Sequence, residues 1–199
     1  MSQALIVIDV QNDFCPDGAL AVPGGNEIVT GINNLMDAFP AVILTQDWHP
    51  VGHSSFATSH PGKNAYDMTE MPYGPQVLWP DHCIQGSQGS AFHHDLNTTR
   101  ADLIVRKGYN PDIDSYSAFF ENDQITPTGL EGYLRSRDIT DLVLVGLATD
   151  FCVSYSAQDA ARLGFDVSVR TDLCRAIDLN GSLAAASEAM QDIGVKLLD

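Results

Sequence analysis

The sequence predicts a three-layer α/β/α fold, in which a six-stranded parallel sheet lies between two layers of helices. Two observations lead to this prediction. Short apolar runs rich in β-branched residues alternate with longer segments of helical spacing, and Gly or Pro marks several of the boundaries. Strands that alternate with helices form parallel sheets with helices on both faces. The six apolar runs lie at residues 4–8, 41–44, 102–106, 142–145, 165–169 and 195–198.

The first part of the chain is predicted to fold as strand, helix and strand. Residues 4–8 are apolar and partly β-branched, which is typical of a strand that is buried on both faces. Apolar side chains then recur at helical spacing over residues 26–39, and Pro40 ends that helix. A second buried strand follows at residues 41–44.

Residues 47–101 break this regular pattern. They are rich in Gly, Pro, His, Ser and aromatic residues, and no hydrophobic period persists. So long an irregular segment inside a compact domain is usually either functional or disordered. Its tryptophans and histidines argue against disorder, so we expect it to carry function.

The alternation of strands and helices resumes after residue 101. Pro127 opens a helix over residues 126–137, and a further helix over 149–163 is closed by Gly164. A last helix is expected over residues 182–192. Because we find no internal repeat, linker or low-complexity segment, the simplest organisation is one domain that covers residues 1–199.

The composition narrows the classes of function. The chain has 26 acidic and 10 basic residues, a formal net charge of −16, and such a surface repels the phosphate backbone of nucleic acids. No apolar run reaches the ~18 residues of a membrane span, and the N-terminus lacks the basic region of a signal peptide. We therefore expect a cytoplasmic protein with a small-molecule partner, without membrane or nucleic-acid binding. The oligomeric state stays open, with a homo-oligomer among the alternatives.

Four polar side chains are expected to meet at one edge of the sheet. Ligands of open parallel sheets bind outside the carboxyl ends of the strands. Asp9, Asp47 and Lys107 follow the first three apolar runs, and Cys152 follows the fourth within a short segment. This convergence predicts an active site at that edge.

Cys152 is the candidate nucleophile. It falls in the first turn of the predicted helix, after Thr149 or Asp150 as N-cap, where the helix dipole and free N–H groups stabilise a thiolate and bind an oxyanion. The alternative is a small buried residue, a common role for cysteine. The four cysteines form no CxxC pair, so no disulfide framework is expected.

Asp9 and Lys107 supply the acid–base chemistry in this interpretation. Asp9 is the candidate general base, which takes the thiol proton of Cys152 and later protonates the leaving amine. Lys107 holds Asp9 and stabilises the thiolate, while Arg106 points to the other face by strand alternation. The alternatives are a structural carboxylate at Asp9 and a solvated charge at Lys107.

A metal site is predicted in the irregular segment. Asp47 and His49 are two residues apart on an extended chain, which places them on one side, and His82 follows later. One carboxylate and two imidazoles suit Zn²⁺ first, with Fe²⁺ and Mn²⁺ as alternatives. His53 is a further candidate, as a ligand or as a neighbour of one. The alternative is that these are ordinary hydrogen-bonded loop histidines, as we expect for His60, His93 and His94.

Aromatic residues near these positions are candidates for a slot that takes a flat ring, although aromatic side chains more often belong to the core. The candidates are Phe14, Trp79, Tyr109, Tyr116, Phe119 and Phe151.

Seven segments of the chain together resemble one family. The chain is similar to the bacterial nicotinamidases, also called pyrazinamidases, of the isochorismatase-like cysteine hydrolases. The matching segments are VIDVQNDF at 7–14, GALAVP at 18–23, TQDWHP at 45–50, WPDHC at 79–83, KG at 107–108, DSYSAFF at 114–120 and GLATDFCV at 146–153.

The resemblance implies a specific chemistry. It implies a catalytic triad of Asp9, Lys107 and Cys152, and hydrolysis of nicotinamide, and of pyrazinamide, through a thioester on Cys152 as a step of NAD salvage. It implies a cis peptide bond before Ala148, with the N–H groups of Ala148 and Cys152 as oxyanion hole. The implied metal ligands are Asp47, His49 and His82. Among the aromatic candidates and the residues of the expected oxyanion hole, we predict that Phe14, Trp79, Tyr116 and Ala148 bind the substrate.

Two other functions remain as alternatives. The triad also fits a related hydrolase of N-carbamoyl or ureido compounds, but a ring nitrogen is a natural metal ligand and a ureido group is not. A catalytically silent metal-binding or scaffold protein is the second alternative, which the complete triad disfavours.

Overall fold

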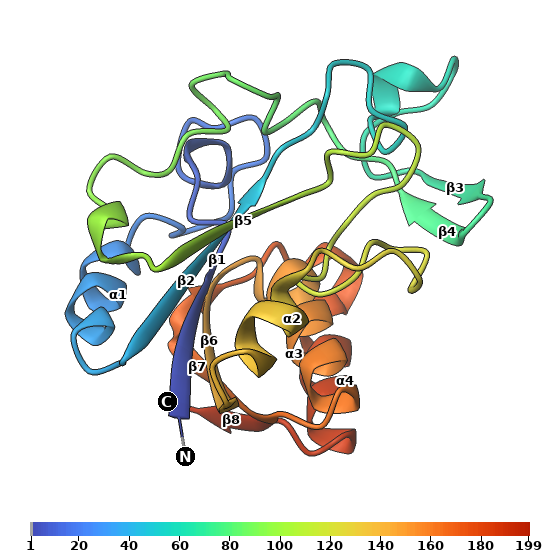
Figure 1. Cartoon of the computed structure of the whole chain (residues 1–199). Coiled ribbons are helices and arrows are strands. Elements are labelled where there is room, and N and C mark those ends of the chain that lie inside the picture. The colour runs from blue at the N-terminus through green and yellow to red at the C-terminus, as the bar shows by residue number, and fades with distance from the viewer. Residues whose placement is uncertain (1) are drawn as a thin grey trace.

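The structure, a computed structural model, describes residues 2–199 and contains the predicted sheet of six parallel strands between layers of helices (Figure 1). The strand order is β5-β2-β1-β6-β7-β8, so the two strands that carry Asp9 and Cys152 at their ends are central neighbours. The side chains of residues 4–8 are all buried, as expected for the core of such a sheet. The strands are β1 (Ser2–Ile8), β2 (Ala41–Asp47), β5 (Leu103–Lys107), β6 (Ile139–Leu147), β7 (Asp166–Arg175) and β8 (Lys196–Leu198).

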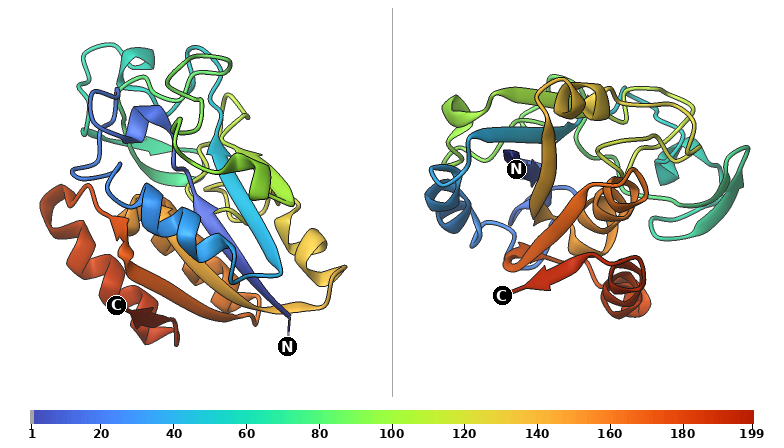
Figure 2. Two further views of the ribbon diagram at one scale, coloured as in Figure 1. Left: turned by 90° about the vertical axis from the view of Figure 1, so that its left-hand side faces the viewer. Right: turned by 60° about the horizontal axis from the view of Figure 1, so that its bottom comes forward.

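The helices cover both faces of the sheet. Figure 2 shows α1 on one face and α2, α3 and α4 together on the other. No helix in residues 2–199 is long and apolar enough to cross a membrane. The α-helices are α1 (Val29–Met36), α2 (Leu130–Arg135), α3 (Ser154–Arg162) and α4 (Ser182–Asp192). Shorter helical turns are η1 (Asn12–Phe14), η2 (Ala57–Ser59), η3 (Thr98–Arg100), η4 (Thr149–Val153) and η5 (Leu179–Gly181).

Three predicted helices are shorter in the structure, and that over 149–163 is α-helical only over α3. The segment 26–39 is helical only over α1, because it enters through hydrogen-bonded turns and ends before Pro40. The segment 126–137 is helical only over α2. Pro127 does not open the helix but pairs with Phe120 in an antiparallel bridge, and the Asp123 carboxylate accepts the N–H of Thr126 at 2.9 Å. Gly129, with φ of 96°, turns the chain into α2 instead.

The irregular segment caps the carboxyl ends of the strands (Figure 1). It contains an unpredicted antiparallel hairpin of β3 (Met68–Met71) and β4 (Gly74–Val77). These strands are four residues long and partly exposed, so they leave no apolar run in the sequence.

Gly146 allows the two central strands to lie close together where they end. Its φ is 118°, and a Cβ at this position would lie 2.1 Å from the carbonyl oxygen of Ile8. Only glycine fits such an approach. The residues that follow each strand, Asp9 and the segment from Ala148 to Cys152, are therefore brought side by side.

Candidate active site

The structure brings the four predicted side chains together. Asp9 follows β1, Asp47 ends β2, Lys107 ends β5, and Cys152 lies in η4 after β6. Asp47 and Lys107 are direct partners in the register of β2 and β5. All four side chains are buried. Arg106 points to the opposite face, as predicted, and its guanidinium lies over the Trp48 ring.

Lys107 contacts both other members of the predicted triad. Its Nζ lies 2.8 Å from Oδ2 of Asp9 and 3.5 Å from Sγ of Cys152. The other Asp9 oxygen, Oδ1, accepts a hydrogen bond of 2.6 Å from the hydroxyl of Thr45. Among the residues described, Oδ2 of Asp9 has no well-directed hydrogen-bond donor, so this oxygen retains the capacity to accept a proton.

Lys107 also forms an ion pair that we did not predict. Its Nζ lies 2.5 Å from Oδ1 of Asp47, and it donates a third hydrogen bond to the carbonyl of Ser115. One ammonium group thus compensates two buried carboxylates. Although burial disfavours the charged amine, Asp47 and Asp9 raise the pKa of Lys107 well above its ordinary value, so it stays charged.

The pKa values of the two proton-exchanging groups are both raised. Burial raises the pKa of the Asp9 carboxyl and Asp47 adds to this, while Lys107 and Thr45 oppose it. Burial also raises the pKa of the Cys152 thiol well above its usual range, against the attraction of Lys107. Burial therefore makes the Cys152 thiol less ready to lose its proton than a free cysteine, whereas we expected the start of a helix to stabilise a thiolate.

The predicted N-cap of Cys152 is also wrong. Residues Thr149–Val153 form a π-helical turn preceded by Ala148, and no side chain caps it. The Asp150 carboxylate turns elsewhere and accepts the backbone N–H groups of Ile177, at 3.0 Å, and Asp178, at 2.8 Å. The α-helix itself begins only at Ser154.

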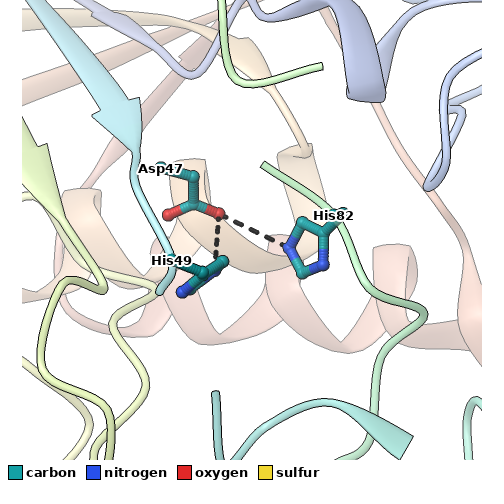
Figure 3. A group of neighbouring side chains, drawn as sticks. All are labelled: Asp47, His49 and His82. Atoms are coloured by element: carbon teal, nitrogen blue, oxygen red, sulfur yellow. Dashed lines mark ion pairs between the residues drawn. The ribbon is translucent and has the colours of Figure 1, made fainter. Parts of the chain in front are cut away.

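The predicted metal ligands form a compact group (Figure 3). Oδ2 of Asp47 lies 3.5 Å from Nε2 of His49 and 3.7 Å from Nε2 of His82. Each imidazole also donates from Nδ1 to a backbone carbonyl at 2.8 Å, His49 to Gly108 and His82 to Pro80. Because a carbonyl can only accept, Nδ1 carries the proton in both rings and Nε2 presents its lone pair to the group.

These residues fit a divalent metal ion. A tetrahedral ion with bonds of about 2.0–2.1 Å separates its ligand atoms by roughly 3.3 Å, close to the spacing around Asp47. Histidine ligands usually donate their second ring N–H to a carbonyl or carboxylate, as both rings do here. Burial opposes ionisation of Asp47, but Lys107 holds the pKa of this carboxyl well below its usual value, so it is charged.

His53 lies beside this group, and both of its ring nitrogens have protein partners, although it also lies within metal-binding distance of His49 and Asp114. Its Nδ1 accepts the N–H of Ser55 at 3.1 Å, and its Nε2 faces the carbonyl of Asn110 at 2.8 Å. Its ring packs against His49, with 4.5 Å between the centroids. The three other histidines of the chain lie outside the group: His60, His93 and His94.

A narrow pocket opens onto Cys152. It encloses about 330 Å³ of empty space, part of it open to solvent. The predicted residues Phe14, Trp79, Tyr116 and Ala148 all line it. Tyr109 and Phe119 do not: Tyr109 is half exposed, and Phe119 packs against Phe165 in the core. The remaining lining residues are Leu20, Asp47, His82, Asp114, Phe151, Cys152 and Ile177.

A hydrogen-bond network holds one wall of the pocket, and it includes two residues that we did not predict, Gln76 and Asp114. The amide of Gln76 donates to Oδ2 of Asp114 and to the hydroxyl of Tyr116, each at 2.8 Å. The indole of Trp79 donates to the same hydroxyl at 3.1 Å. Asp114 and Gln76 are buried, and they fix the aromatic residues that face Cys152.

The peptide bond between Leu147 and Ala148 is cis, as the resemblance implies. Ala148 lies next to η4, so its backbone and that of Cys152 border the same end of the pocket. This arrangement can supply N–H groups to an oxyanion that forms at the attacked carbon.

The chain is similar to known proteins over almost its whole length. The model of the isochorismatase domain matches residues 3–199. The Acinetobacter baumanii nicotinamidase pyrazinamidease is 52% identical, with a TM-score of 0.98 over 100% of this chain and 96% of that one. PnC1 from L. infantum in complex with nicotinate is 39% identical, with a TM-score of 0.87 over 100% and 92%. Pyrazinamidase of Pyrococcus horikoshii in complex with zinc is 32% identical, with a TM-score of 0.79 over 100% and 99%.

Proposed function

This chain belongs to the isochorismatase domain family, and on that basis we propose that it is a metal-dependent cysteine amidohydrolase that converts nicotinamide to nicotinate and ammonia. One observation carries the proposal. A buried Asp9–Lys107–Cys152 cluster opens into a pocket with aromatic walls, and a group of metal-ligating residues borders the same pocket. The pocket is narrow and has aromatic walls, which suits a single flat ring with a carboxamide.

In the proposed orientation of the substrate, the ring nitrogen lies at the metal-binding end of the pocket and the carboxamide lies at the Cys152 end. Asp47, His49 and His82 would hold the metal ion, which when bound supplies a Lewis acid for the pyridine nitrogen of the ring. Phe14 and Trp79 flank the ring, and the carboxamide carbon then faces Cys152. Pyrazinamide, which has a nitrogen at the same ring position, would bind in the same way.

Acylation begins with a proton transfer from Cys152 to Asp9. Sγ of Cys152 then attacks the carboxamide carbon, and the N–H groups of Ala148 and Cys152 stabilise the negative oxygen of the tetrahedral intermediate. Asp9 returns its proton to the amide nitrogen, the C–N bond breaks, and ammonia leaves. The product of this half-reaction is a thioester between Cys152 and the nicotinoyl group.

Deacylation uses the same residues in reverse. Asp9 accepts a proton from a water molecule, whose oxygen attacks the thioester carbon. The C–S bond breaks, the thiol of Cys152 regains a proton, and nicotinate is released. Lys107 remains charged throughout and keeps the Asp9 carboxylate oriented.

The proposal also covers the metal ion, the cellular location and the metabolic role of the enzyme. Zn²⁺ is the proposed metal, with Fe²⁺ and Mn²⁺ as alternatives, and we place the enzyme in the cytoplasm, where it serves NAD salvage. Nicotinate and nicotinaldehyde, as ligands in structures of related nicotinamidases, support a pyridine substrate.

Substrate comparison tests the proposed specificity. We expect the purified protein to release ammonia from nicotinamide at a much higher kcat/KM than from an N-carbamoyl compound. A preference for the N-carbamoyl compound would contradict the proposal and favour the alternative within the same superfamily.

A further inference from the structure

The carboxylate of Asp13 joins loops that carry the metal-ligating histidines and the pocket wall. Asp13 lies in η1, after Asp9, and is neither a candidate ligand nor a candidate acid or base. Its Oδ2 accepts the backbone N–H of Cys83 at 2.7 Å, and its Oδ1 accepts that of Ala19 at 3.2 Å. The first contact crosses to a segment 70 residues away, and the second closes the loop that follows η1.

Through Cys83, the Asp13 carboxylate is connected to both His82 and His49. Cys83 follows His82 directly and has φ of 47°, a conformation that needs local support in a residue other than glycine. Its N–H is held by Asp13, and its carbonyl accepts the backbone N–H of His49 at 3.0 Å. Cys83 is thus the backbone link between His82 and His49, and Asp13 fixes its orientation.

Gly89 provides the space in which the Asp13 side chain lies. A Cβ on Gly89 would lie 2.1 Å from Oδ2 of Asp13, the same oxygen that binds Cys83. The carbonyl of Gly89 also accepts the backbone N–H of Asp13 at 3.0 Å. Gly89 therefore confines both the side chain and the backbone of Asp13.

The same segment carries one wall of the pocket. Phe14 follows Asp13 and lines the pocket, and its ring lies against that of His82, with 5.5 Å between the centroids. Leu20, another lining residue, donates its N–H to the carbonyl of Asp13 at 3.0 Å. A shift of Asp13 would move the metal-ligating histidines and the ring-binding wall together.

We infer that Asp13 is a positioning residue that sets His82 and His49 at metal-binding distance and holds Phe14 against them. The inference rests on the proposed metal site and extends it beyond its ligands. Partners that orient histidine ligands contribute strongly to metal binding, and their loss typically weakens affinity about 10–100-fold. Asp13 acts one step further out, through the backbone of Cys83, so we expect a loss of about tenfold.

The test measures metal affinity directly, apart from activity. Metal-free protein is titrated with Zn²⁺ against a chromophoric chelator, for the wild type and for Asp13→Ala, Asp13→Asn and Gly89→Ala. Asp13→Asn keeps the size of the side chain but leaves only one oxygen that can accept a hydrogen bond. It therefore tests the same contacts if Asp13→Ala does not fold. Gly89→Ala keeps the carboxylate but displaces it. Asp17→Asn, an exposed carboxylate in the same loop, is the matched control.

The expected result is a Zn²⁺ dissociation constant at least about tenfold higher for Asp13→Ala, with smaller increases for Asp13→Asn and Gly89→Ala and none for Asp17→Asn. The KM for nicotinamide should rise in the same order. Wild-type affinity in folded Asp13 variants, with only a lower melting temperature, would overturn the inference and leave the metal site intact. A wild-type chain that binds no Zn²⁺ would overturn the metal site and this inference with it.

Discussion

Lys107 and Asp47 form a buried ion pair, with 2.5 Å between Nζ and Oδ1. The other oxygen of Asp47 faces His49 and His82, while the same Nζ contacts Asp9 and Cys152. The pair therefore joins the group that activates the nucleophile to the group that would hold the metal.

Replacement of Lys107 by Met should destabilise the metal-free protein by about 3–5 kcal/mol, because two buried carboxylates lose their counter-charge. Urea unfolding of metal-free protein at neutral pH measures this free energy. The pKa values of Asp9 and Asp47 would then lie above those of the unfolded chain. The loss of stability should accordingly be complete above these raised values and shrink as the pH falls and the carboxyls protonate.

The matched control is Lys63→Met, since the amine of Lys63 is exposed and donates only to a backbone carbonyl. Equal stability of the Lys107 and Lys63 variants at neutral pH would contradict the role that we assign to the buried charge.

Replacement of Thr45 by Val should shift the pH dependence of activity. The proposed mechanism needs the Asp9 carboxylate, so we expect kcat/KM to fall as the pH drops through the pKa of Asp9, which lies above its ordinary value of 3.8. The Thr45 hydroxyl lowers this pKa by donating to the carboxylate. Its loss should therefore move the acid limb of the kcat/KM profile to higher pH. Thr140→Val, an exposed threonine, should leave the limb in place, and an unchanged limb in Thr45→Val would argue against Asp9 as the base.

Replacement of Cys152 by Ala should abolish turnover while the metal content stays at the wild-type level. Sγ is the proposed nucleophile, and Cys152 is not among the proposed ligands Asp47, His49 and His82, although it also lies within metal-binding distance of Asp9 and Asp47. Ammonia release and elemental analysis measure the two properties, and mass spectrometry of rapidly quenched wild-type protein should detect a nicotinoyl adduct on Cys152. Cys174→Ala, another buried cysteine, is the control and should remain active. Turnover by the Cys152 variant would exclude a thioester mechanism.

Replacement of His49 by Ala should lower metal content and raise the KM for nicotinamide together. His53→Ala is the informative comparison, because both nitrogens of His53 are already occupied by protein partners. The metal content of His53→Ala should stay closer to that of the wild type than the metal content of His49→Ala. Full occupancy in His49→Ala, measured by elemental analysis after dialysis, would be incompatible with the ligand set Asp47, His49 and His82.

The members of the site could be predicted because they follow strands that are apolar in the sequence. Asp9, Asp47 and Lys107 each end or follow such a run, and parallel strands place their carboxyl ends at one edge. The Lys107–Asp47 pair could not be predicted in this way. It depends on β2 and β5 being neighbours in a particular register, which the individual strands do not encode.

The contacts between loops are the second part of the site that could not be predicted from the sequence. The carboxylates of Asp13 and Asp150 bind backbone N–H groups of distant segments, and nothing periodic marks such partners. The same holds for the aromatic residues, since Tyr116 lines the pocket while Phe119, three residues later, is in the core. Side chains in irregular segments do not alternate between faces, so position alone could not separate them.

Ammonia release from nicotinamide, measured before and after chelation and again after metal is added back, tests the central claim most directly. The account predicts rapid release by the purified protein, a large fall on chelation, and recovery with Zn²⁺, Fe²⁺ or Mn²⁺. No release under any metal condition would contradict the assignment of nicotinamide as substrate. Release that is unaffected by complete removal of metal would contradict the role given to Asp47, His49 and His82.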